Sequence, residues 1–135
     1  MNDYIKIRRL ALKYRELSFI KALAIMKINK TPVFKKLYMK RAEVNTVREL
    51  RRIVTYILLY EAVFEKTLKM LDTDSERELV DEVCRLGKSV NKTAIDAYAS
   101  PSAVERALKK FTLYFISNLS ASRRIILPLS TIRRK

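Results

Sequence analysis

The chain of 135 residues contains no histidine, no tryptophan and no glutamine, and it has one cysteine and one glycine. Histidine is the side chain best suited to proton transfer near neutral pH, so its absence removes the usual base for a serine or cysteine nucleophile. A single cysteine, Cys84, cannot form an intrachain disulfide, and we expect it to serve in packing within a reducing compartment. These absences predict a protein that is not an enzyme and needs no cofactor.

The scarcity of glycine also bears on the fold. No Asn-Gly or Asp-Gly pair is present to form a tight hairpin turn, which argues against an antiparallel sheet. The hydrophobic fraction of 49% is high enough for a single domain of this length to bury a core without disulfides or metals. An all-α domain is therefore predicted.

Helix starts are indicated by four local patterns. Pro32 and Pro101 each follow a hydroxyl residue, and Thr46–Glu49 and Ser75–Glu78 have the spacing of a capping box. Apolar residues recur at helical spacing between these starts. The patterns predict helices over residues 3–29, 32–43, 46–71, 75–98 and 101–119, with Gly87 as a point where the fourth helix could break.

Charge is distributed unevenly along the chain, whose net charge is +15. Residues 1–55 hold 15 Lys and Arg against 4 Asp and Glu, residues 56–110 hold 9 against 10, and residues 111–135 hold 5 against none. Basic ends on a nearly neutral middle are typical of a protein that binds a polyanion. We expect a small helical bundle at 46–119, with a long basic helical arm at 1–45 and a basic C-terminal arm at 120–135.

The first predicted helix has two apolar faces. One holds Ile7, Leu10 and Leu17, and the other holds Phe19 and Met26. A helix of a small monomer usually needs one such face, so the second face predicts a homo- or hetero-oligomer that assembles through this helix. The alternative is a central helix that the other helices surround on all sides.

Nucleic acid is the polyanion that the composition favours, with DNA favoured over RNA. Phosphate binding requires cations at sufficient density, and arginine adds bidentate geometry. No base-reading motif is present, so we expect contacts to the backbone alone. The predicted nucleic-acid-binding residues are Lys6, Arg8, Arg9, Lys13, Arg15, Lys27, Lys35, Lys36, Lys40, Arg41, Arg48, Arg51, Arg52, Arg123, Arg124, Arg133 and Arg134.

An acidic segment at 72–82 is the one candidate metal site, but it lacks the glycine and the bidentate acid of a calcium loop. Acidic residues at a helix start also stabilise the helix dipole, and we predict no metal site here. A basic partner protein for this segment remains an alternative.

No apolar stretch is long enough to span a bilayer, and no signal peptide is evident, so we expect an intracellular or virion location. Binding to an acidic membrane surface is a further alternative. Abundant charge and few amides point to a thermophilic source.

The predicted function is that of a structural protein that coats or packages DNA or RNA. In layout alone, the chain is similar to the helical coat proteins of filamentous archaeal viruses, which implies a viral nucleocapsid or coat protein. It is also similar to the small all-helical subunits of RNA-guided CRISPR effector complexes. A protein-only helical adaptor is the third alternative.

Overall fold

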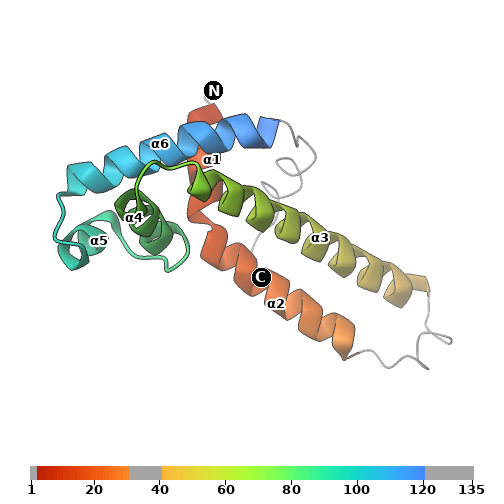
Figure 1. Ribbon diagram of the computed structural model, residues 1–135. Helices are drawn as coiled ribbons and strands as arrows, with labels where there is room; N and C mark the ends of the chain where they lie inside the picture. Colours follow the sequence, from red (N-terminus) through yellow and green to blue (C-terminus); the bar gives the residue numbers. More distant parts are fainter. Residues whose placement is uncertain (1–2, 31–40, 121–135) are drawn as a thin grey trace.

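The computed structural model describes residues 3–30 and 41–120, with side chains from Thr46 onward in the second range. Within these ranges the chain forms six helices and no strand (Figure 1). They are α1 (Asp3–Leu12), α2 (Tyr14–Asn29), α3 (Arg41–Lys69), α4 (Asp74–Cys84), α5 (Val90–Asp96) and α6 (Pro101–Ser120). The prediction of an all-α fold is confirmed.

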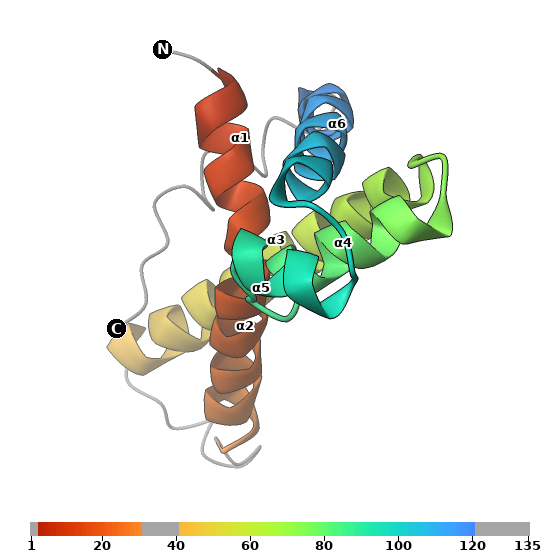
Figure 2. The same ribbon diagram turned by 90° about the vertical axis from the view of Figure 1, so that its left-hand side faces the viewer.

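The helices divide between two regions of the molecule. α2 and α3 lie side by side in opposite directions, and their outer parts extend away from the other four helices (Figures 1 and 2). We call residues 20–30, at the end of α2, and residues 41–56 of α3 the distal hairpin. The remaining described residues form the compact end, where α6 packs on α1, α3, α4 and α5.

Aromatic side chains form the centre of the compact end. Tyr60, Phe64, Phe111 and Phe115 are fully buried, and Tyr14 packs beside Tyr60 and Phe64. The contacting ring centroids lie 4.6 to 6.2 Å apart, in tilted and edge-to-face arrangements that aromatic quadrupoles favour. This cluster joins α2, α3 and α6 and accounts for the largest buried side chains of the core.

The predicted helix over 3–29 is wrong in one respect, because it breaks at Lys13 into α1 and α2. The Lys13 N–H donates to the Leu10 carbonyl in a tight turn, and the Tyr60 hydroxyl donates to the same carbonyl at 2.7 Å. A side chain 50 residues away therefore supplies a hydrogen bond at the break. Neither glycine nor proline marks this position in the sequence.

One predicted helix start and one predicted capping residue are also wrong. α3 already begins at Arg41, so Thr46 lies inside the helix and the predicted end at residue 43 does not exist. At α4 the capping residue is Thr73, whose hydroxyl accepts from the Glu76 N–H at 3.2 Å. Thr73 and Glu76 have the same capping-box spacing as the predicted pair Ser75 and Glu78, but they lie two residues earlier in the chain. The predicted cap at Ser100 is confirmed, since its hydroxyl accepts from the Ala103 N–H at 3.1 Å.

The predicted fourth helix is interrupted where the glycine allows it. Gly87 has φ +71° after α4, and the Lys88 N–H donates to the Glu82 carbonyl to close the helix end. The Arg15 guanidinium donates to the Leu86 carbonyl at 3.1 Å and covers the glycine. The break at Gly87 therefore ties the end of α4 to the start of α2.

The described part of the predicted N-terminal arm packs against the body. Ile7, Leu10 and Leu17 are buried in the same core as the aromatic cluster. Residues 31–40, where most of the predicted second helix falls, and residues 121–135 of the predicted C-terminal arm lie outside the described residues. The division into arms and body stays a prediction.

Candidate nucleic-acid interface

Acidic side chains are largely neutralised inside the fold. Of the thirteen acidic side chains that the structure describes, ten form ion pairs, and the other three are Asp3, Glu16 and Glu78. The pairs link neighbouring helices as well as turns of one helix. Lys21 on α2 pairs with Glu61 on α3, and the Lys88 Nζ lies 3.0 Å from both Glu82 and Asp96.

Pairing of the acids leaves a surplus of cations. Eleven described lysines and arginines take no part in an ion pair among the described residues, and ten of these eleven are exposed. They are Lys6, Arg9, Lys13, Arg15, Lys30, Arg48, Arg51, Lys66, Lys69, Arg106 and Lys109. Isolated ion pairs on a surface add little stability, but here they determine where free positive charge remains.

Three of the unpaired cations form a stripe along α1 and its junction with α2. Lys6, Arg9 and Lys13 follow one another at i, i+3 and i+7, the spacing that places side chains on one side of a helix. Ile7 and Leu10 are buried on another side of the same helix. We call these three residues the α1 stripe; Lys6 and Arg9 are exposed and Lys13 is half-buried.

Other predicted binding residues take part in structural contacts. Arg8 lies 2.9 Å from Glu105 on α6, Arg52 lies 3.1 Å from Glu49, and Arg15 donates to the Leu86 carbonyl. Lys27 is exposed on α2. These contacts reduce the freedom of Arg8 and Arg52 to meet a phosphate.

Arg48 and Arg51 are exposed on α3 without an ion pair among the described residues. The remaining predicted residues lie where the structure describes no side chain. They are Lys35, Lys36, Lys40, Arg41, Arg123, Arg124, Arg133 and Arg134, of which Arg41 is described as the first residue of α3 only in its backbone.

Sequence reasoning missed two exposed cations on α3. Lys66 and Lys69 follow Arg48 and Arg51 along the solvent side of the helix, since residues 48, 51, 55, 59, 62, 66 and 69 recur at helical spacing. A charge count treats residues 56–110 as neutral, because it does not reveal which acids are paired. Helical spacing over the whole of α3 was the signal that could have identified them.

The second apolar face of the first predicted helix is exposed. Ile5, Leu12, Leu23 and Met26 are 44%, 42%, 38% and 52% exposed, and Phe19 is 46% exposed. The alternative of a helix surrounded on all sides is therefore wrong for the described residues.

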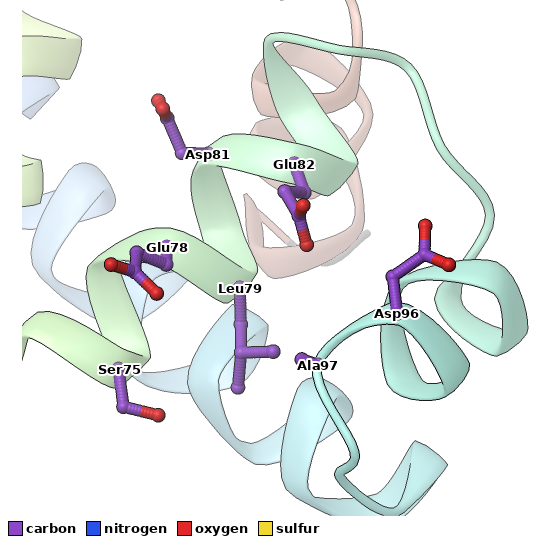
Figure 3. Close-up of a pocket in the computed structure, with 7 residues that line it drawn as sticks. All are labelled: Ser75, Glu78, Leu79, Asp81, Glu82, Asp96 and Ala97. Atoms are coloured by element: carbon purple, nitrogen blue, oxygen red, sulfur yellow. The ribbon is translucent and has the colours of Figure 1, made fainter.

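Acidic residues line a pocket of about 270 Å³ between α4 and α5. The Glu82 and Asp96 carboxylates both point into the space between these helices, whereas the Asp81 carboxylate points away (Figure 3). The Lys88 ammonium donates to both Glu82 and Asp96, and its hydrogen bond lowers the pKa of Asp96. Among the described residues, no group of three or more acidic or cysteine side chains is arranged to hold a metal ion.

Cys84 is fully buried in the core, as predicted. Burial raises the pKa of its thiol to about 12, because the charged thiolate is poorly solvated there. The thiol is therefore protonated at neutral pH and is a poor nucleophile.

No helix in the described ranges is long and apolar enough to cross a membrane. Comparison of the chain with protein-family models, with curated proteins and with solved structures found no match.

Proposed function

We propose that this protein is a non-enzymatic nucleic-acid-binding protein that coats or packages DNA or RNA through contacts to backbone phosphates. One observation supports the proposal above all others. Ten of the thirteen described acids form ion pairs within the fold, yet eleven lysines and arginines form none among the described residues. A polyanion would neutralise this surplus and release its own condensed counterions.

The spacing of the cations on the α1 stripe is compatible with contacts to the phosphates of a DNA backbone. Helical rise separates Lys6 from Lys13 by about 10 Å along the axis. Duplex DNA presents about six phosphate charges over that length. Lysine ammonium groups and an arginine guanidinium on a helix surface can contact phosphates without entering a groove, so binding without sequence preference is expected.

A coat or packaging role also requires contacts between copies, and the exposed apolar residues on α1 and α2 support this part of the proposal. Such a role includes that of a viral nucleocapsid protein. An RNA-guided effector subunit is the alternative, and it would bind single strands at low stoichiometry and co-purify with other chains. The protein-only adaptor has less support, because most acids of segment 72–82 are already paired within the chain.

Charge reversal on the α1 stripe tests the proposal. The K6E/R9E variant should bind a labelled 30-nucleotide duplex at least about tenfold more weakly than the wild type at low salt, because two phosphate contacts become repulsive. Fluorescence anisotropy would measure Kd for duplex and single-stranded DNA and RNA. Circular dichroism should show unchanged helix content, since both residues are exposed.

The matched control is R106E/K109E, which removes the same charge from two exposed, unpaired cations on α6. We expect a smaller loss for this variant. Equal losses would mean that binding responds to net charge alone and that the α1 stripe has no special role. Absence of measurable binding by the wild type would contradict the proposed function itself.

A further inference from the structure

We propose that copies of this chain associate head to tail, with the α5 end of one copy seated on the exposed face of α2 in the next. The inference deepens the assembly part of the proposed function and rests on it. It makes no use of phosphate binding, so the two can fail separately.

The receiving surface is a ridge on α2, which we define by Arg15, Leu23, Met26 and Lys30. Leu23 and Met26 are 38% and 52% exposed, and their spacing places them on one side of the helix. Arg15 and Lys30 lie near the two ends of the same side, and both are exposed; Arg15 donates to the Leu86 carbonyl of its own chain but has no ion pair among the described residues. The α2 ridge is thus apolar at its centre and basic at its ends.

The inserting surface is a pair of side chains at the end of α5, which we call the α5 knob. Ile95 is 71% exposed and Tyr98 is 98% exposed, the two most exposed large apolar residues among those described. Tyr98 adopts φ +53°, and its N–H donates to the Ile95 carbonyl while the Ala99 N–H donates to the Ala94 carbonyl. These hydrogen bonds fix the backbone of the turn, so the backbone at Tyr98 needs no further ordering when the ring becomes buried.

Charge complementarity identifies a second copy as the partner. Residues 3–30 hold eight Lys and Arg against two acids, whereas residues 72–98 hold seven acids against four Lys and Arg. Ala97, the residue before Tyr98, lines the acidic pocket between α4 and α5 (Figure 3). Glu78 lines the same pocket, is exposed and has no ion pair among the described residues. The other six acids of residues 72–98 are paired within the chain, so Glu78 and the net charge of −3 on this segment are what the basic ends of the α2 ridge would meet.

The arrangement of the two surfaces determines the kind of assembly. They lie on different helices, and Tyr98 is almost wholly exposed within one copy, so the α5 knob does not occupy the α2 ridge of its own chain. A contact between two different surfaces leaves one of each free at the ends of a dimer. Such contacts produce rings or open filaments, which suits a protein that covers a long polymer.

Two polar variants and their mixture test this interface. L23Q/M26Q alters the α2 ridge, I95Q/Y98Q alters the α5 knob, and L113Q changes a leucine of α6 that is 52% exposed as the control. Each would be purified free of nucleic acid, after nuclease digestion at high salt, and studied by sedimentation velocity over a concentration series. All five altered positions are exposed, so helix content should not change.

The wild type and L113Q should form concentration-dependent oligomers, while each polar variant alone should associate at least about tenfold more weakly. A mixture of the two polar variants should form a dimer and nothing larger, because each supplies one intact surface. A wild type that stays monomeric at the highest concentration would overturn the inference and leave the α2 ridge to another partner. Polar variants that associate normally, or that fail to form the mixed dimer, would also overturn it.

Discussion

The compact end and the distal hairpin are built from the same kind of amphipathic helix, but they differ in what they bury. In the compact end, Phe64, Phe111 and Phe115 have no exposed surface, and most nearby acids are paired. In the distal hairpin, Leu23 and Met26 are exposed and Arg48 and Arg51 have no ion pair among the described residues. The compact end thus has a large aromatic core beneath a surface that carries the α1 stripe and the α5 knob, whereas the distal hairpin has few buried side chains and exposes both apolar surface and charge.

Buried and exposed residues of the molecule therefore contribute differently to folding stability and to binding of another molecule. A closely packed core tolerates few substitutions, and its buried side chains are not available to another molecule. Exposed apolar and cationic groups add little to folding and are available for binding. Substitutions of buried residues in the compact end should therefore change the free energy of unfolding, and those of exposed residues on the α1 stripe, the α5 knob and the distal hairpin should change association.

Replacement of Phe64 by alanine should have the largest effect on stability. Phe64 contacts four other rings in the core, and loss of a buried phenyl group typically costs about 3–5 kcal/mol. Met26→Ala in the distal hairpin is the control, with an expected cost below about 0.5 kcal/mol. Urea denaturation followed by circular dichroism measures both, and similar costs for the two variants would contradict the division between the regions.

Tyr60→Phe should have an intermediate effect. The variant removes the hydroxyl that donates to the Leu10 carbonyl at the break between α1 and α2, leaving a buried acceptor with one partner fewer. The expected cost is about 1–3 kcal/mol. Tyr56→Phe is the matched control, because Tyr56 is half-buried and none of its hydrogen bonds is part of this break. If both variants have the same urea midpoint of unfolding as the wild type, the Tyr60 hydroxyl does not stabilise the break between α1 and α2.

The smallest expected effect is a pH-dependent change in Tm when Asp96 is replaced by asparagine. The Lys88 ammonium lowers the pKa of Asp96 below its ordinary value of 3.8, so the charged form is favoured in the folded state. A lowered folded-state pKa contributes stability above the unfolded-state pKa and loses it as the pH falls through the folded-state pKa. Wild type should therefore melt slightly above D96N between pH 5 and 7, with the difference vanishing towards about pH 2.

Glu78→Gln is the control for D96N, because Glu78 lines the same pocket and forms no ion pair among the described residues. If its Tm follows pH in the same way as that of D96N, the pair with Lys88 is not the cause of the D96N effect. A difference between D96N and the wild type that persists unchanged at low pH would show that the pair with Lys88 is not its cause.

Much of the fold could be predicted because it depends on local signals. The core stripe of α6, the cap at Ser100 and the break at Gly87 each follow from residues close together in the sequence. The break at Lys13 could not be predicted, since its added hydrogen bond comes from Tyr60 on another helix. The cap of α4 was assigned to Ser75 and not to Thr73 because both residues begin a capping-box pattern. The sequence gives no reason to prefer one over the other.

The candidate interface could be predicted only in outline. The sequence shows that cations outnumber acids, but pairing depends on tertiary contacts such as Arg8 with Glu105, 97 residues apart. The same contacts identify Lys66 and Lys69 as exposed and unpaired. The second apolar face of the first predicted helix was visible from spacing alone, because its period is local.

The central claim is that the unpaired surface cations bind nucleic-acid phosphates, and its most direct test is the salt dependence of duplex DNA binding by the wild-type protein. If each copy neutralises about eight phosphates, a plot of log Kobs against log salt concentration should be linear with a slope near −7. A slope near zero, or no binding at low salt, would contradict the claim.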